Sequence, residues 1–350
     1  MSALTVLCSA TPRVDGDTKP GGDLPYGIGE LRDRYEIDWI VPRHGPVSRR
    51  VVPRVDGVVR RLSPGRRGWS LARAVRRRTS GPVLSVFEDA RLAFARCQRR
   101  GAPRPHVMIS CWLAQDVADR PDAAGSWRAS LATVSAVCVY SANQPELLRT
   151  RLGIDGARIH VVPFGVDTGY YDSRHLVGAG GGDGVVAVGS DSRRDYATLF
   201  AAAERTGIPM TVACHPRNLV GLSVPPMVRI VRVFDEGYRE LLHRADLVVT
   251  TTTAPAYPSG QSVVLEAMSM GTATITTDSA AMRDYVIEGE TGALVPAGDA
   301  VALAGRLREL LGDRAQRAAL ARRAAEDVRR RFTLRRQWDA VARVIEGVTR

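Results

Sequence analysis

The sequence predicts an α/β fold with two domains of similar length, each built around a parallel sheet. The chain has 350 residues, of which 45% are hydrophobic and 25% charged. This length and composition suit two ordinary globular domains. Short apolar runs alternate with helix-like segments in both halves, which is typical of βαβ units. We expect domains at 1–165 and 166–330, and a C-terminal helix in 331–350 that crosses back to the first domain.

In the first half, the apolar run Leu4–Ser9 predicts a strand, and a polar loop containing Gly22 follows it. The segment Leu24–Arg34 has the apolar spacing of a short helix, and Ile37–Val41 predicts the next strand. Strand, loop, helix and strand in this order form one βαβ unit. Further strands are expected at Val107–Ser110 and Ala136–Tyr140, and further helices at Phe87–Arg100 and Trp127–Val134. The stretch Arg43–Arg78 fits neither period, so we assign no element to it.

The second half repeats this alternation after a glycine-rich stretch, Gly178–Gly184. These glycines precede a strand, so they predict a linker and not a phosphate-binding turn, which must follow a strand. The expected strands are Val185–Val188, Met210–Ala213, Val228–Val231, Leu247–Thr251, Thr274–Thr276 and Leu294–Val295. The expected helices are Tyr196–Arg205, Tyr238–Arg244, Val263–Met270, Ala300–Leu311, Arg314–Arg331 and Arg336–Ile345. Substrate should bind in a cleft between the domains, at the carboxyl ends of the strands.

The net charge is +12, and the positive charge is concentrated in one segment. Between Arg43 and Arg104 there are 17 arginines and only three acidic residues. A basic surface of this kind attracts nucleic acid, anionic lipid or phosphorylated substrates. The five cysteines are scattered without a CxxC pair, which argues against a disulfide framework or a structural zinc site. The N-terminal apolar stretch is too short for a signal peptide, so we expect a cytoplasmic protein.

The strongest motif is Pro258–Gly271, which reads PSGQSVVLEAMSMG and follows the apolar strand Leu247–Thr251. A glycine at the start of a helix allows close approach, and the free N–H groups and the helix dipole favour a diphosphate there. The residues expected at this helix start are Ser259, Gly260, Gln261, Ser262 and Val263. Glu266 lies one turn beyond Ser262, where its carboxylate can accept two hydrogen bonds from a ribose diol. Taken alone, Glu266 would be better explained as a solvated residue on a surface helix, but the flanking segments favour the ribose contact.

Together with its flanking segments, this motif resembles the GT-B glycosyltransferases of the glycosyltransferase family 4 type. The matching segments are Val161–Tyr171 (VVPFGVDTGYY), Val186–Leu199, Leu241–Thr253 and Val264–Asp299. The resemblance is strong over residues 137–312 and weak over 1–136. It implies the GT-B architecture, in which two Rossmann-like parallel-sheet domains face a central cleft. It also implies transfer of a sugar from a nucleoside diphosphate, UDP- or GDP-linked, to a hydroxyl or amine. Retention of anomeric configuration and no requirement for a metal are further implications.

The resemblance also implies roles for individual residues. Glu266 matches the second of the family's two glutamates, which grips the ribose hydroxyls. The turn Gly260–Ser262 matches the segment whose amides face the diphosphate and the sugar. Arg194 falls at the family's lysine, whose cation neutralises the leaving diphosphate, and an arginine can do this in a bidentate manner. Arg193 is an equally good candidate by spacing.

Two positions depart from the family pattern. Gly189 keeps the family's glycine after the first strand of this domain, but Ser190 stands where the family has an arginine. Pro258 stands eight residues before Glu266, at the position of the family's first glutamate, close to the donor sugar. These departures keep open an alternative function, in which the chain is a GT-B relative that binds a nucleotide sugar without ordinary transfer.

Several single residues are weaker candidates. His44 and His106 flank expected strands of the first half, where a base that activates the acceptor would project. His215 follows the strand Met210–Ala213, where it would line the nucleobase end of the donor pocket. The amide of Gly22 follows a strand and would approach a phosphate or sugar. Trp112 would stack on an acceptor ring or pack as an ordinary aromatic residue.

The sequence leaves the acceptor open among small molecules, glycans and lipid-linked acceptors. The basic segment 43–104 would hold the protein at the inner face of an anionic membrane if the acceptor were lipid-linked. A nucleic-acid-binding function is the third hypothesis. We do not expect nucleic acid as a partner, because the arginines lack interleaved aromatic residues and a recognisable binding motif.

Overall fold

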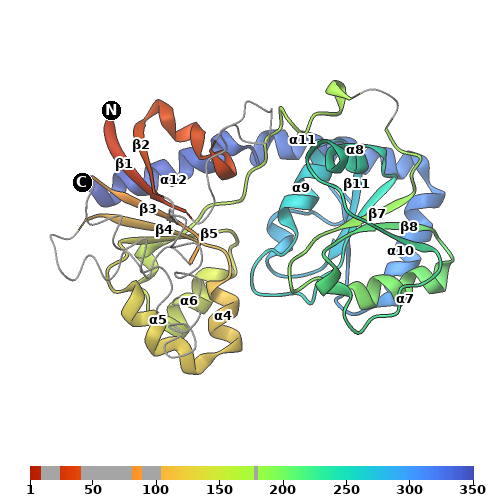
Figure 1. Ribbon diagram of the computed structural model, residues 1–350, viewed down its shortest axis with the longest axis horizontal. Coiled ribbons are helices and arrows are strands. Elements are labelled where there is room, and N and C mark those ends of the chain that lie inside the picture. The colour runs from red at the N-terminus through yellow and green to blue at the C-terminus, as the bar shows by residue number, and fades with distance from the viewer. Residues whose placement is uncertain (9–23, 41–80, 89–103, 177–179) are drawn as a thin grey trace, which may run out of the picture. The chain divides into compact units, whose positions relative to one another are not determined.

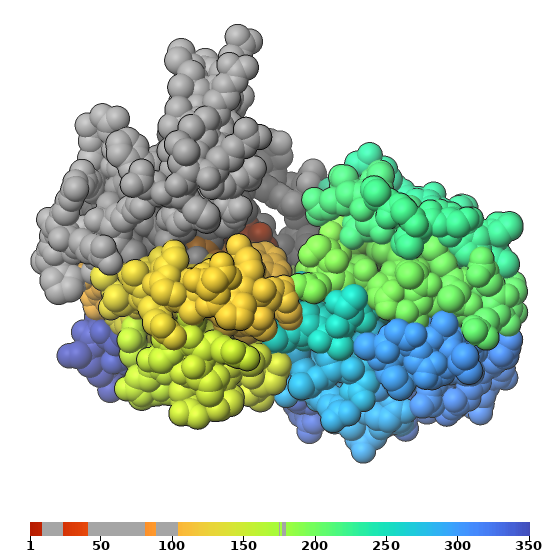
Figure 2. All heavy atoms as spheres, turned by 90° about the horizontal axis from the view of Figure 1, so that it is seen from below, coloured from red at the N-terminus to blue at the C-terminus, as the bar shows by residue number. Residues whose placement is uncertain are grey.

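The computed structural model describes residues 1–8, 24–40, 81–88, 104–176 and 180–350, and the other residues are grey in Figures 1 and 2. The chain divides into two compact units. The first unit takes its described residues from the chain up to Pro163 and from Gln337–Arg350, and the second from Phe164–Arg336. Each unit contains a sheet of six described strands, all parallel. The predicted α/β fold with two parallel sheets is therefore confirmed.

The first sheet has the strand order β2-β1-β3-β4-β5-β6. Its strands are β1 (Ser2–Leu7), β2 (Tyr35–Ile40), β3 (Val83–Val86), β4 (His106–Ser110), β5 (Ala136–Val139) and β6 (Ile159–Val161). The three strands β3, β4 and β5 and the end of β1 are buried, as expected for a sheet covered on both faces. The helices of this part are α4 (Leu113–Asp119), α5 (Ala124–Leu131) and α6 (Gln144–Leu152), and the 3₁₀ segments are Pro25–Asp33, Pro121–Ala123 and Gly156–Arg158.

The second sheet has the strand order β12-β11-β10-β7-β8-β9. Its strands are β7 (Val185–Val188), β8 (Met210–Ala213), β9 (Val228–Val231), β10 (Leu247–Thr250), β11 (Ala273–Thr277) and β12 (Ala293–Val295). The helices of this unit are α7 (Tyr196–Thr206), α8 (Asp235–Arg244), α9 (Gln261–Ser269), α10 (Ala300–Gly312) and α11 (Arg314–Arg331), and its 3₁₀ segments are Ser173–His175, Pro216–Leu219 and Met282–Asp284. The helix α12 (Leu334–Thr349) follows and enters the first unit at Gln337. The chain leaves β7 toward β8 and β9 and later returns to β10 on the other side. The order in which strands are added to the sheet therefore reverses between β7 and β10. Ligands bind preferentially at such a switch point.

Alternating residues of the second sheet face two helix layers, which Figure 1 shows on either side of the strands. On one face, Val185 packs in a cluster with Leu199 of α7 and Leu303 of α10. On the other face, Val186 packs with Leu242 of α8 and Ala267 of α9. Because both faces are covered, the central strands β7 and β10 are almost entirely apolar and were predictable as strands.

The helix α12 packs within the first unit over most of its length. Trp338 is 1% exposed and donates its indole N–H to the carbonyl of Tyr26 at 3.0 Å. Arg34 pairs with Asp339 and with Glu346, each at 3.0 Å. These ion pairs are partly exposed and contribute little individually, so the buried indole is the stronger attachment.

Most predicted elements match the structure closely. The strands β7, β8 and β9 and the helix α11 have the predicted bounds, and other boundaries differ by a few residues. The helix predicted from Phe87 is wrong at its start, because Phe87 has φ +66°, a left-handed conformation that no helix residue adopts. Glu88 is helical, whereas residues 89–100 and the stretch Arg43–Arg78 lie outside the described residues. The segment Pro25–Asp33 is 3₁₀ and kinked, not a regular helix.

The structure adds four elements that the sequence analysis missed, namely β3, β6, α4 and α6. The cysteines that the structure describes are buried and free, and Cys97 lies outside the described part. Burial raises the pKa of the Cys138 thiol to about 12, so this group is inert at neutral pH. Within the described part of the chain, every helix is too short or too polar to cross a membrane.

A close backbone contact in the second unit requires glycine at position 165. Val166 donates to Phe332 O at 2.8 Å and accepts from Leu334 N at 3.1 Å. A Cβ at Gly165 would lie 2.6 Å from the carbonyl carbon of Thr333 and 2.9 Å from Leu334 N. Gly165→Ala is therefore expected to lower the free energy of unfolding by about 1–3 kcal/mol, measured by urea denaturation followed by circular dichroism.

The matched control is Gly305→Ala, in helix α10 of the same unit. An added Cβ meets no atom within 4 Å there, so alanine should stabilise the helix by about 0.5–1 kcal/mol. If Gly165→Ala unfolded at the same urea concentration as Gly305→Ala, the close contact at residue 165 would be refuted.

Candidate functional site

The loops that follow β7 and β10 are fastened together at the carboxyl edge of the second sheet. Asp195 N donates to Thr251 O at 3.0 Å, and Thr253 N donates to Arg193 O at 2.9 Å. The Thr251 hydroxyl donates to Asp195 O at 2.7 Å. These bonds fix the backbone on both sides of the switch point between the two strands. A ligand at this edge therefore meets a preformed surface.

The side chain of Arg194 lies in a narrow slot between two glycines. A Cβ at Gly189 would lie 2.6 Å from Arg194 Cζ, and a Cβ at Gly260 would lie 3.1 Å from the same atom and overlap Nη1. Both glycines have positive φ, +152° and +94°. The absence of side chains at residues 189 and 260 is thus what makes room for the guanidinium. The hydroxyl of Tyr196 fixes the first loop by donating to Gly189 O at 2.7 Å.

The start of helix α9 forms the second side of this slot. Gly260 is the residue before the helix, and the first N–H groups of a helix have no partner within it. The N–H groups of Ser262 and Val263 belong to this first turn. Anions bind readily at such an end because the free N–H groups and the dipole both attract negative charge.

Several buried polar atoms at the slot have no hydrogen-bond partner among the described residues. They are Nε and Nη1 of Arg194, the hydroxyl of Ser259 and the hydroxyl of Thr250. Each buried unpaired group costs about 1–3 kcal/mol, so their grouping around one slot calls for an explanation. Burial lowers the pKa of Arg194, and nearby groups, Tyr196 and Asp191 foremost, raise it. A guanidinium stays charged in proteins, so the slot presents a cation with donors to spare.

Glu266 of α9 is held by two tyrosines. The hydroxyl of Tyr238, on α8, donates to Glu266 Oε2, and Tyr171 forms a second side-chain hydrogen bond with this carboxylate. Burial raises the pKa of Glu266 to about 7, and the two hydrogen bonds oppose this shift. Burial also raises the pKa of Tyr238, while the charge of Arg194 lowers it. Arg194, Tyr238 and Glu266 therefore share one neighbourhood.

Two further contacts surround the Ser190–Asp191 loop. The hydroxyl of Tyr257 donates to the carboxylate of Asp191, at 2.7 Å from Oδ1 and 2.9 Å from Oδ2. Arg217, after β8, donates from Nη2 to Ser190 O at 3.1 Å. The carboxylate of Asp191 thus contacts Tyr257, the residue before Pro258. The guanidinium of Arg217 contacts the backbone of Ser190.

The structure brings most predicted site residues together at this edge. Arg193 and Arg194 follow β7, His215 follows β8, and the rest lie on the loop before α9 or on α9 itself. His215 is exposed, and its Nδ1 accepts from Arg217 N at 3.2 Å. The residues gathered here from the sequence prediction are Gly189, Ser190, Arg193, Arg194, His215, Ser259, Gly260, Gln261, Ser262, Val263 and Glu266.

His106 is not placed as predicted. It is the first residue of β4, at the amino end of the strand, and it is 0% exposed. Its Nε2 lies 2.7 Å from the hydroxyl of Ser85, and burial lowers its pKa to about 3. A buried neutral imidazole at the amino end of a strand cannot take a proton from a ligand at the carboxyl end, so we do not retain it as a base. Gly22 and His44 lie outside the described residues.

Sequence reasoning missed Tyr171, Tyr238, Asp191 and Tyr257. Tyr238 lies 28 positions before Glu266 in the chain and meets it only because α8 packs beside α9. No local spacing predicts such a contact. The pair Tyr257–Asp191 joins two loops 66 positions apart and is equally invisible in the sequence.

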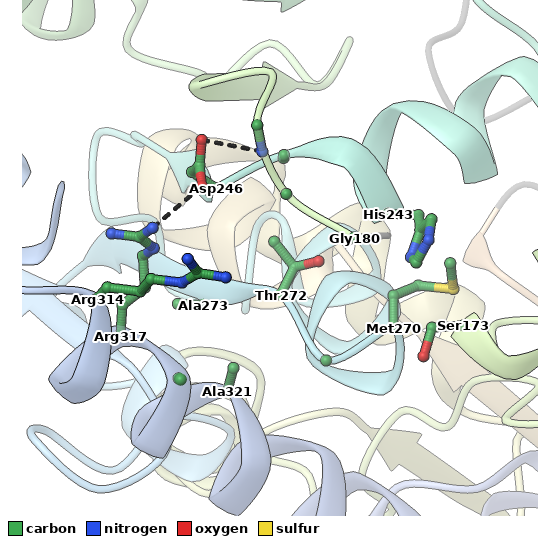
Figure 3. Close-up of a pocket in the computed structure, with 15 residues that line it drawn as sticks. Ser173, Gly180, His243, Asp246, Met270, Thr272, Ala273, Arg314, Arg317 and Ala321 are labelled. Atoms are coloured by element: carbon green, nitrogen blue, oxygen red, sulfur yellow. Dashed lines mark hydrogen bonds and ion pairs between the residues drawn. The ribbon is translucent and has the colours of Figure 1, made fainter. Parts of the chain in front are cut away.

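A cavity of about 580 Å³ lies elsewhere in the second unit, at the amino ends of β10 and β11. Figure 3 shows Asp246 beside Arg317, which it contacts at 3.1 Å, with Arg314, Thr272 and His243 around the same space. The carboxylate of Asp246 also accepts from two backbone N–H groups. This cavity is at the opposite edge of the sheet from Arg194 and is not part of the candidate site.

Comparison with known sequences places the site in a recognisable context. Residues 212–313 match the family described as Glycosyl transferases group 1. The chain is 33% identical over 101 residues to the lipopolysaccharide core biosynthesis mannosyltransferase LpcC of Rhizobium leguminosarum, which is 29% of each protein. It is 41% identical over 86 residues to a phosphatidyl-myo-inositol mannosyltransferase of Mycobacterium leprae, 25% of this chain and 22% of the relative. The matches thus span less than a third of these relatives' lengths.

Solved structures resemble the chain over almost its whole length. Anabaena HepE in complex with UDP and glucose has a TM-score of 0.73 at 15% identity, covering 99% of this chain and 100% of HepE. Sucrose-phosphate synthase from Thermosynechococcus elongatus has a TM-score of 0.74 at 17% identity, covering 99% of both chains. At such identities the likeness concerns the fold. The chain therefore has the GT-B fold, and residues 212–313 of its second unit are similar to the group 1 glycosyl transferases.

Proposed function

We propose that the protein is a glycosyltransferase that takes its sugar from a nucleoside diphosphate. The observation that carries this proposal is the Arg194 slot, where a charged guanidinium lies beside the start of α9. Two of its buried N–H-bearing nitrogens have no hydrogen-bond partner among the described residues. A guanidinium and a helix start together provide donors for several phosphate oxygens. Glu266 supplies the carboxylate that a ribose diol requires. The family match over residues 212–313 supports the same function.

In the proposed reaction, the bond between the anomeric carbon and the diphosphate oxygen breaks. Its electron pair stays on the departing nucleoside diphosphate, where Arg194 and the first turn of α9 stabilise the added charge. The anomeric carbon forms a new bond to the acceptor oxygen or nitrogen, and the acceptor proton is released to the diphosphate or to water. Because protein cations balance the leaving charge, we propose that the reaction is metal-independent. Retention of anomeric configuration and the family 4 type belong to the same proposal.

The donor is proposed to be UDP- or GDP-linked. The complex of HepE with UDP and glucose supports a uridine donor. His215, exposed at the end of β8, is proposed to line the nucleobase end. The carboxylate of Asp191 is proposed to take the place of the family's glutamate, where this chain has Pro258. The guanidinium of Arg217 is proposed to take the place of the family's arginine, where this chain has Ser190. The acceptor and a membrane contact through residues 43–104, which lie almost wholly outside the described part, stay predictions.

A second candidate function is nucleotide-sugar binding without transfer, and Pro258 and Ser190 favour it. One experiment separates the two functions. The protein is screened by thermal shift against UDP-, GDP-, ADP- and dTDP-sugars, and nucleoside diphosphate release is then measured for each sugar that binds. Binding with acceptor-dependent release supports transfer, and the anomeric coupling constant of the product tests retention. Binding without release supports the second candidate, and failure of every donor to bind contradicts both.

A further inference from the structure

Three aromatic side chains meet at one edge of the first sheet, and two of them are well exposed. Tyr26 is 42% exposed and Trp112 is 40% exposed. The Phe87 ring lies between them, with centroid distances of 5.0 Å to Tyr26 and 5.3 Å to Trp112. We call these three residues the aromatic cluster. The proposed transfer reaction, as derived above, gives them no role.

The aromatic cluster lies at the switch point of the first sheet. Phe87 directly follows β3, and Trp112 follows β4 by two residues. The hydroxyl of Tyr26 lies near the thiols of Cys8 and Cys111, which follow β1 and β4. The strands β1, β3 and β4 are neighbours in the sheet. After β1 the chain forms β2 on one side of it, and the next described strand, β3, lies on the other side. The carboxyl edge at such a switch point is where parallel sheets bind ligands.

The backbone of the aromatic cluster is held in place by dedicated contacts. Tyr26 and Phe87 have φ of +61° and +66°, conformations that cost energy for residues with side chains and that concentrate at functional sites. Trp338 donates to Tyr26 O at 3.0 Å. Glu88 accepts from Trp112 N at 2.7 Å. The rings are therefore positioned before any ligand arrives, which reduces the entropic cost of binding.

Among the described residues, two polar groups beside these rings are largely buried, namely the Tyr26 hydroxyl and the Glu88 carboxylate. Burial, more than the nearby thiols, raises the pKa of the Tyr26 hydroxyl. Glu88 is 6% exposed and also accepts from the hydroxyl of Ser110 at 2.8 Å. A bound sugar needs hydrogen-bond partners for its hydroxyls, whereas a bound aromatic ring can pack against the faces and edges of other aromatic rings. The cluster presents both faces and edges, because its rings are inclined to one another at 86° and 46°.

We propose that the aromatic cluster binds a flat aromatic ring, and that this ring is the body of the acceptor in the proposed sugar transfer. The assignment to the acceptor rests on the proposed function, whereas the binding of a flat ring does not. An aromatic acceptor with a hydroxyl substituent would be held by its ring faces at the carboxyl edge of β1, β3 and β4.

The test uses 2-naphthol as the flat aromatic probe and methyl α-glucopyranoside as the sugar probe, with affinities measured by NMR titration of the full chain. Trp112→Ala and Tyr26→Gly should each weaken 2-naphthol binding at least fivefold. Tyr26→Gly is the safer variant for folding, because glycine prefers the left-handed conformation of residue 26. The matched controls are Asp235→Gly, also at a positive φ, and Phe234→Ala, which is 70% exposed. Both are in the second unit and should leave 2-naphthol binding unchanged.

The proposal is overturned if the native protein does not bind 2-naphthol at millimolar concentration, or if the two cluster variants bind it as well as the native protein. It is also overturned if the glucoside binds at the cluster and 2-naphthol does not. UDP-glucose binding is measured on the same samples. If naphthol binding depends on the cluster but no nucleotide sugar binds, the proposed function and the assignment to an acceptor fail, while the ring site stands.

Discussion

Arg194→Ala is expected to lower kcat for sugar transfer about 10²–10³-fold, the cost of removing one preorganised donor from a developing oxyanion. The guanidinium lies between Gly189 and Gly260, with Nε and Nη1 buried and unpaired among the described residues. Among the side chains that the structure describes in the slot, Arg194 is the one that supplies a full positive charge to the leaving diphosphate. The measurement is nucleoside diphosphate release at saturating donor, with the donor identified in the thermal-shift screen.

Three further variants distinguish a specific role from a general loss of charge. Arg193→Ala removes the neighbouring cation but keeps the backbone bond from Thr253 N to Arg193 O, and its effect should be below about tenfold. Arg194→Lys should recover only part of the activity, because an ammonium cannot form the bidentate contact. Gly260→Ala should displace the guanidinium without changing any charge and should resemble Arg194→Ala. Equal losses for Arg193→Ala and Arg194→Ala would refute the assignment of the slot to Arg194.

The central strands of the second unit were predictable from sequence because they are buried on both faces. The run that became β7 is a continuous apolar stretch between Gly184 and Gly189, so its ends were clear. Short or weakly patterned elements were not predictable. Strand β6 has three residues, and helix α6 buries only Gln144, Leu148 and Leu152, one of which is polar. Such elements form because neighbouring elements cover them, not because of their own pattern.

The candidate site was predictable where it depends on local order along the chain. The turn at Gly260 and the helix that follows it show in the sequence as glycine and small polar residues before an apolar run. The tyrosines that hold Glu266 were not predictable, because α8 and α9 bring them together only in the folded chain. The opposite error concerned His106. A polar residue at a strand start looked accessible in the sequence, but the Ser85 hydroxyl lets it be buried.

The affinity for the proposed nucleotide-sugar donor, with UDP-glucose as the probe, is expected to increase about tenfold between pH 6 and pH 8, through the ionisation of Glu266. Burial raises the pKa of this carboxyl to about 7, so about one molecule in eleven is ionised at pH 6 and about ten in eleven at pH 8. The ionised carboxylate can accept both hydrogen bonds of a ribose diol, and the protonated acid keeps only part of this capacity. If only the ionised form binds, the apparent Kd scales inversely with its fraction. Isothermal titration across this pH range measures the effect, and the diphosphate of UDP-glucose does not itself titrate there.

Two variants assign the pH dependence to Glu266. Glu266→Gln should bind UDP-glucose weakly and with the same Kd at pH 6 and pH 8, because the amide does not titrate. Tyr238→Phe removes a hydrogen bond that stabilises the ionised carboxylate and keeps its pKa from rising further. In this variant the midpoint of the affinity profile should therefore move to higher pH, because the proton is held more tightly. If Glu266→Gln kept the pH dependence of the native protein, the titrating group would be a different residue. A midpoint that moved to lower pH in Tyr238→Phe would contradict the role of the tyrosine.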